Sequence, residues 1–114
     1  MYTINRSIAI IRPKKPFVDW ANQLPDAEFK SSLDDFKTDC LAILIPDYDT
    51  DEEAEGYINE IYEDIFIEIL SGWCTKEAWF PQDRTNEMFW QWFDVELHSI
   101  VIDSCMEPIE KGEP

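Results

Sequence analysis

The clearest hydrophobic pattern lies between Thr50 and Ser71, where apolar residues recur at every third or fourth position. This spacing predicts an amphipathic helix. The apolar positions are Ala54, Tyr57, Ile58, Ile61, Tyr62, Ile65, Phe66, Ile69 and Leu70. Thr50 and Glu53 have the spacing of a capping box, so we expect the helix to begin after Thr50. We expect Gly72 to end it. Ile67 lies among acidic residues on the polar side, which makes it a candidate contact residue.

Short apolar runs followed by proline predict three strands. Residues 8–11, 41–45 and 78–80 are apolar, and a proline follows each run within two residues. Because proline cannot donate a hydrogen bond to a neighbouring strand, it ends a strand rather than continuing it. We therefore expect all three runs to form strands.

Residues 95–101 predict a fourth strand, because apolar and polar residues alternate from Val95. Such alternation is typical of a strand with one buried face. Ile100 and Ile102 place apolar groups on the polar side as well. We therefore expect the far end of this strand to be covered on both faces.

The remaining patterns predict shorter helices over residues 16–24, around 28–37 and over 88–93. The order of elements favours an α+β domain, a two-layer sandwich in which a sheet of three or four strands has helices on one face. A small parallel βαβ-type α/β sheet is the open alternative. We expect one globular domain over residues 1–106 and a polar tail over 107–114, where proline and glycine recur.

The charge of the chain changes what it is expected to bind. The sequence carries 25 acidic and nine basic residues, and its net charge is −16. A surface this negative repels nucleic acid and anionic membranes and favours a basic protein partner. Mimicry of DNA phosphates by carboxylates is a special case that stays open.

The N-terminus and the cysteines predict a cytoplasmic protein. The first residues lack the apolar core of a signal peptide. The longest apolar run, residues 40–45, is far shorter than the ~20 residues of a membrane helix. The three cysteines are an odd number without paired spacing, which favours a reducing compartment.

Few residues have spacings that indicate catalysis. The sequence contains no P-loop, Rossmann fingerprint, GxSxG motif or paired zinc ligands, so we expect no cofactor. Asp94, Glu96 and His98 alternate along the predicted last strand and therefore project from one face. Such residues can converge on a metal ion or let a histidine act as a base. A small enzyme or divalent-metal-binding domain centred on them is the alternative function. A solvent-facing strand face normally shows the same alternation of polar residues, and it is the favoured explanation of this pattern.

The aromatic segment 88–93 predicts both core and contact residues. On a helix, Phe89, Trp92 and Phe93 share one face, which suits the core. Trp90 points away from that face and is a candidate anchor for a partner, because tryptophan is enriched at interface hot spots.

Four basic residues precede the first acidic one, and three of them, Arg12, Lys14 and Lys15, follow the first predicted strand. In a parallel sheet this turn would meet Asp47 and Asp49; in an antiparallel sheet it would not. We include the three basic residues among the candidate contact residues. The sequence thus favours a non-catalytic interaction protein for a basic protein partner, with homodimerisation possible because exposed aromatic residues need cover.

Overall fold

The computed structural model describes residues 1–25 and 40–113. The helix expected around residues 28–37 lies outside the described residues. In the described part, three α-helices accompany a three-stranded and a two-stranded antiparallel sheet. No helix of that part is long and apolar enough to cross a membrane.

The larger sheet has β2 (Arg6–Pro13) at its centre, between β3 (Leu41–Pro46) and β4 (Phe93–His98). Both pairings are antiparallel. The prediction of a two-layer α+β architecture is confirmed, and the parallel βαβ alternative is wrong. Strand β2, the first of the three in sequence, lies at the centre of the sheet, and β4, the last, forms one edge. Because both neighbours of β2 run antiparallel to it, the sheet contains no parallel pair that would need a crossover connection.

The long helix α2 (Asp51–Ser71) packs against this sheet, and its predicted ends are confirmed. The Thr50 hydroxyl accepts the Glu53 N–H at 3.2 Å, and Gly72 follows the last helical residue. The reciprocal half of the capping box is displaced by one residue, because the Glu53 carboxylate accepts the N–H of Asp49 at 3.1 Å. The N–H group of Asp49, just before the helix, and that of Glu53, in its first turn, therefore both have a hydrogen-bond acceptor.

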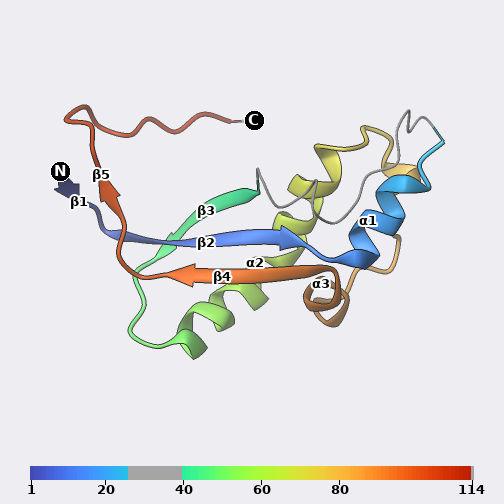
Figure 1. Ribbon diagram of the computed structural model, residues 1–114, viewed down its shortest axis with the longest axis horizontal. Coiled ribbons are helices and arrows are strands. Elements are labelled where there is room, and N and C mark those ends of the chain that lie inside the picture. The colour runs from blue at the N-terminus through green and yellow to red at the C-terminus, as the bar shows by residue number, and fades with distance from the viewer. Residues whose placement is uncertain (26–39, 114) are drawn as a thin grey trace.

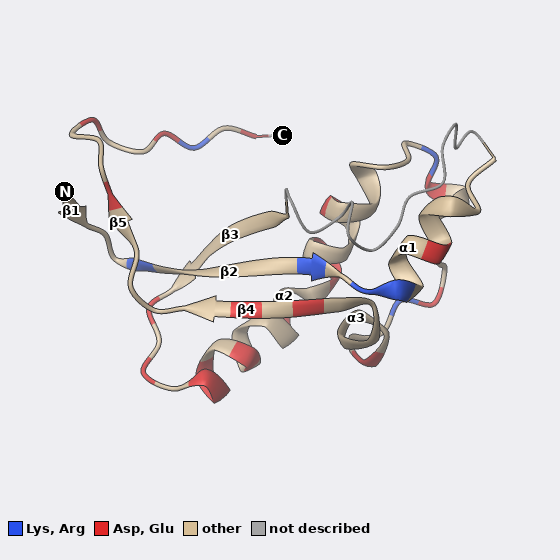
Figure 2. Ribbon diagram, viewed as in Figure 1, with Lys and Arg blue, Asp and Glu red and all other residues tan. Residues whose placement is uncertain are grey.

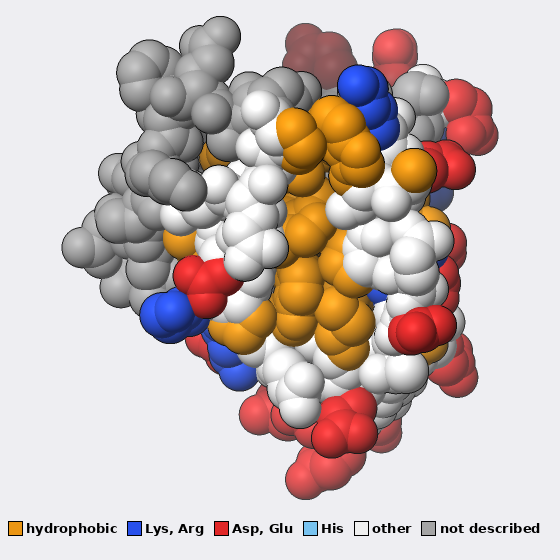
Figure 3. Space-filling view, turned by 90° about the vertical axis from the view of Figure 1, so that its right-hand side faces the viewer, with side chains coloured by type: hydrophobic (Ala, Val, Ile, Leu, Met, Phe, Trp, Pro, Cys, Tyr) orange, Lys and Arg blue, Asp and Glu red, His pale blue; other side chains and the backbone are white. Residues whose placement is uncertain are grey.

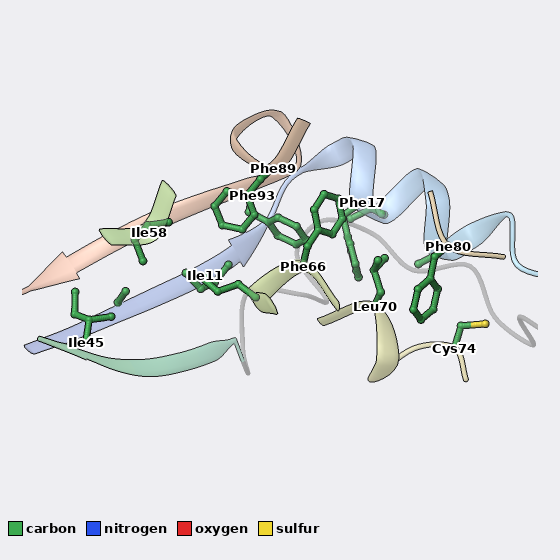
Figure 4. Packing of buried hydrophobic residues seen from close by; sticks show 14 of the residues in the cluster. Ile11, Phe17, Ile45, Ile58, Phe66, Leu70, Cys74, Phe80, Phe89 and Phe93 are labelled. Carbon is green, nitrogen blue, oxygen red and sulfur yellow. The ribbon is translucent and has the colours of Figure 1, made fainter. Parts of the chain in front are cut away.

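The core fills the space between α2 and the inner face of the sheet (Figure 1). Strand β2 turns Ser7, Ala9 and Ile11 toward this core, while the residues between them stay half-buried on the opposite, open face. Phe66 of α2 is fully buried and its ring lies 5.2 Å from that of Phe93 (Figure 4). Large-to-small changes in such a packed cluster cost about 3–5 kcal/mol.

Helices α1 (Lys15–Asn22) and α3 (Asn86–Trp92) close one end of the core with aromatic side chains. Phe89 and Phe93 are fully buried and Trp92 packs against the core, as predicted from their shared face. At this end, hydrophobic side chains form a strip on the surface with charged side chains around it (Figure 3).

The strand predicted over residues 78–80 is wrong, and the one predicted over residues 95–101 is wrong in part. The run before Pro81 forms the 3₁₀ turn η2 (Glu77–Trp79), in which the Phe80 N–H bonds to the Glu77 carbonyl at 3.1 Å. Its short apolar run therefore satisfies its backbone locally instead of pairing with a strand. Strand β4 ends at His98, and the chain beyond it is not covered on both faces: Ile100 is 82% exposed and Ile102 is 54% exposed. Ile102 lies instead in β5, which leaves the main sheet.

Strands β1 (Tyr2–Thr3) and β5 (Ile102–Asp103) form the second sheet, a short ribbon beyond one end of the first (Figure 1). The described part of the predicted polar tail, residues 107–113, contains no helix or strand. The chain measures 45 × 29 × 27 Å, so it is elongated along the direction in which this ribbon projects.

Candidate interaction surface

Acidic residues recur along α2 and the turn before it (Figure 2), and their side chains are exposed to solvent. We call this surface the acidic face. It contains ten exposed carboxylates and no basic residue between positions 47 and 68: Asp47, Asp49, Asp51, Glu52, Glu53, Glu55, Glu60, Glu63, Asp64 and Glu68. The surface forms because the apolar period of α2 turns its other residues away from the sheet.

The first part of the acidic face has local structural uses. Asp51, Glu52 and Glu53 occupy the first turn of α2, where the helix dipole stabilises negative charge. The Asp47 carboxylate accepts a 3.5 Å hydrogen bond from the buried hydroxyl of Ser7. Partial burial, and secondly the charge of Asp51, raise the pKa of the Tyr48 phenol. This end of the face is explained by capping and packing.

The second part of the acidic face has little compensating charge from the part of the chain that the structure describes. Between described residues one ion pair reaches it, from Arg84 Nη2 to Glu63 Oε1 at 3.0 Å. The side chains of Glu60, Asp64 and Glu68 have no hydrogen bond or ion pair with another described residue. These three residues follow one another at four-residue spacing, so their charges repel along one line of the helix.

Ile67 is a hydrophobic residue exposed within this part of the acidic face. Its side chain is 36% exposed, beside Glu68 and one turn from Asp64. It also borders a cleft of about 160 Å³ that Phe80 and Gln82 line from the loop after α2. Arg84 lies at the same cleft and is held in place, because Nη1 donates to the Pro81 carbonyl at 2.7 Å. The cleft therefore has a hydrophobic side and a fixed polar side next to the carboxylates.

Trp90 does not lie beside Ile67. Its indole Nε1 donates to Asn59 Oδ1 on α2 at 2.7 Å, and its ring meets that of Phe89 edge-on at 5.5 Å. The side chain is half-buried against the core. Asn59 precedes Ile67 by eight residues, about 12 Å along the helix axis. The two predicted anchors therefore do not form one patch, and Trp90 serves to attach α3 to α2.

The basic residues predicted as contacts all have partners within the chain. Arg12 Nη1 pairs with Glu96 Oε1 at 3.0 Å, and Lys15 pairs with Asp19 at 2.9 Å. Lys14 Nζ donates to the Trp90 carbonyl at 2.9 Å. Because the sheet is antiparallel, Arg12 lies at the opposite end of β2 from the turn that follows β3. The predicted meeting of this basic turn with Asp47 and Asp49 does not occur.

Glu96 and His98 of β4 form an ion-pair arrangement with Arg12 on the open face of the sheet. Glu96 Oε2 lies 2.7 Å from His98 Nε2 while its other oxygen contacts Arg12. Hydrogen bonds from His98 and then from Arg12 hold the pKa of Glu96 below its usual range. Asp94 is exposed opposite Arg12 in the strand register.

This arrangement differs from a metal site because it contains an arginine cation among the carboxylates. The Arg12 cation already engages one oxygen of Glu96. In the described part of the chain, no group of three or more His, Cys, Asp or Glu residues is placed to hold a metal ion. Nor does His98 activate Ser7, because the two side chains lie on opposite faces of the sheet and the Ser7 hydroxyl donates to the Ser99 carbonyl at 3.2 Å.

The structure also exposes a hydrophobic surface that the sequence pattern did not indicate. Six of the nine large hydrophobic residues exposed in the described chain lie at its two ends, where they form or flank the β1–β5 ribbon: Met1, Tyr2, Ile100, Ile102, Met106 and Ile109. Met1 and Tyr2 are separated from the other four residues by about a hundred positions in sequence, so no local pattern predicts that the two groups meet.

Comparison of the chain with protein-family models, with curated proteins and with solved structures found no match.

Proposed function

We propose that this protein is a non-catalytic binding module that presents the acidic face of α2 to a basic protein partner. The observation that carries the proposal is the line formed by Glu60, Asp64 and Glu68, which have no charged partner among the described residues, with exposed Ile67 beside it. Repulsion along this line destabilises α2, so the line is not explained by the stability of the fold.

The acidic face also combines the two kinds of group that an interface needs: charged groups that attract the partner and an apolar group that contacts it. A ring of carboxylates attracts a basic partner over a distance of about a Debye length and accelerates its association. An apolar residue within the ring then provides contact area from which water is removed. Ile67 and the adjoining cleft at Phe80 supply such a contact.

The proposal is tested with a fluorescein-labelled decalysine peptide, whose binding is followed by fluorescence anisotropy at 0.05 and 0.3 M NaCl. One variant neutralises the line on α2 by the changes Glu60→Gln, Asp64→Asn and Glu68→Gln. A matched control neutralises three exposed carboxylates elsewhere by the changes Asp83→Asn, Asp94→Asn and Glu110→Gln. Both variants have the same net charge.

We expect the α2 variant to weaken binding about tenfold more than the control, since three exposed ion pairs of up to about 1 kcal/mol each are lost at one site. Binding should also weaken from 0.05 to 0.3 M NaCl. Equal weakening by the two variants would show that only the net charge matters and would contradict the proposal.

The role of Ile67 is tested with a second peptide of the same charge that carries leucine at every third position. The wild-type protein should bind this peptide more tightly than decalysine. In the Ile67→Ser variant that preference should shrink, whereas Ile109→Ser, a matched change in the tail, should leave it intact. A preference unaffected by Ile67→Ser would exclude Ile67 from the interface.

A further inference from the structure

The two ends of the chain form an arm that projects from the domain. We call residues 1–5 and 99–113 the terminal arm. Its only regular structure is the β1–β5 ribbon, which is two residues long on each strand and pairs Tyr2 with Asp103 and Thr3 with Ile102. A two-stranded ribbon is marginally stable in water on its own. The arm therefore needs contacts beyond its own hydrogen bonds.

The terminal arm also exposes large apolar side chains, alongside charged residues such as Glu107 and Glu110. Ile102 on the ribbon is 54% exposed, and Met106 and Ile109 on the tail are 80% and 57% exposed. Soluble monomers rarely leave so many large apolar side chains uncovered on one projection. The arm has the character of one half of an interface.

A matching surface lies on the open face of the main sheet, next to the arm. Ile8 of β2 is half-buried there, and its register partner Leu44 of β3 is 45% exposed. Leu44 and Ile4, together with Met106 and Ile109 of the arm, line a hollow of about 320 Å³. Figure 1 shows the tail running back along the sheet from the ribbon. One chain thus exposes large apolar side chains both on the arm and on the part of the open sheet face next to this hollow, which we call the groove.

The charge distribution favours a second copy of this chain as the occupant. The open face carries Arg6 and Arg12 together with Asp94 and Glu96, and the hollow is bordered by Arg6 and Lys111 as well as by Asp103 and Glu107. Opposite charges therefore balance on this side of the chain, in contrast to the acidic face. Because the apolar residues of α2 pack toward the sheet, its exposed carboxylates lie on the side of the helix away from the sheet, one sheet-to-helix layer and the helix itself from the open face. Those layers together exceed the Debye length of about 8 Å at physiological salt. Two copies that meet through their open faces keep their acidic faces apart.

We propose that two copies of this chain form a symmetric dimer in which the terminal arm of each lies against the open sheet face and groove of the other. Such an interface is isologous, so it closes at two copies and does not extend into a filament. It leaves both acidic faces outward and is independent of the proposed binding function.

The test is sedimentation velocity of the full chain from 1 to 100 µM at 0.15 and 0.5 M NaCl. We expect a monomer–dimer equilibrium whose dissociation constant decreases at higher salt, because screening weakens the repulsion between two chains of net charge −16. Leu44→Glu on the open face and Ile109→Glu on the arm should each raise that constant at least tenfold. Ile67→Glu, the same kind of change on the acidic face, should leave it unchanged.

Folding of each variant is checked by its circular dichroism. Ile109→Glu lies outside every helix and strand, so its effect on association is separable from an effect on the fold. A chain that stays monomeric at 100 µM in 0.5 M NaCl would overturn the proposal. So would a dimer that both Leu44→Glu and Ile109→Glu leave intact, or a larger assembly.

Discussion

Replacing Asp64 by lysine should stabilise the protein, because it converts repulsion on α2 into attraction. Asp64 is exposed, with Glu60 one turn before it and Glu68 one turn after it. Residues four apart on a helix are neighbours, and like charges at this spacing destabilise the helix. Between described residues the ion pair of Arg84 reaches Glu63 and none reaches Asp64, so the repulsion is not offset locally.

The magnitude follows from the two neighbouring pairs. Each like-charge pair costs about 0.2–0.5 kcal/mol and each opposite pair contributes about as much. Changing the sign at Asp64 affects both pairs, so the free energy of unfolding should rise by about 1 kcal/mol at low salt. For a domain of this length, that corresponds to an increase of roughly 4 °C in Tm.

The assay is urea unfolding followed by circular dichroism at 0.02 and 1 M NaCl. At 1 M NaCl the Debye length is about 3 Å, so most of the gain should disappear. Asp83→Lys is the matched control, because it makes the same charge change in a loop without helical neighbours; we expect it to stay within about 0.5 kcal/mol of the wild type. An equal gain in both variants would attribute the effect to net charge and refute the reasoning about the line of carboxylates.

Three further outcomes follow from the structure. Thr50→Ala should lower the free energy of unfolding by about 1 kcal/mol in urea titrations, whereas Thr50→Ser should largely retain it, because the hydroxyl caps the Glu53 N–H. Phe66→Ala should cost about 3–5 kcal/mol in the same assay, since the ring is fully buried against Phe89 and Phe93. The lowered pKa of Glu96 means that its contribution is present above the ordinary glutamate pKa and is lost as the pH falls through the lowered value. The stability difference between the wild type and Glu96→Gln should therefore shrink on acidification, and an NMR titration should show the Glu96 pKa rising toward its usual value in His98→Ala.

The helix α2 and the strand β2 could be predicted because the apolar residues that recur periodically in their sequences are the ones that are buried in the fold. The bounds of α2 follow from its apolar spacing and from the Thr50 cap, both of which are local properties. The inner face of β2 follows from alternation in the same way. The direction in which β3 pairs with β2 depends on a long connection, so the sequence left the parallel and antiparallel sheets open.

The candidate surfaces were less predictable, because they depend on which side chains reach one another across the fold. Trp90 points away from the core face of its own helix, yet Asn59 on another helix binds its indole. Arg12 and Glu96 were assigned to two different candidate sites and form one ion pair across neighbouring strands. Ile67 stays exposed, as its place on the helix indicated. The terminal arm could not be predicted because its halves lie at opposite ends of the chain.

The most direct test of the proposed binding surface is to map it with ¹⁵N-labelled protein and unlabelled decalysine by NMR. We expect the largest amide shift changes on the second part of the acidic face, residues 60–68, and smaller ones at the arm and at β4. The changes at 60–68 should be reduced in the variant that neutralises Glu60, Asp64 and Glu68. Shift changes spread evenly over all exposed carboxylates, or centred on β4, would contradict the assignment of function to α2.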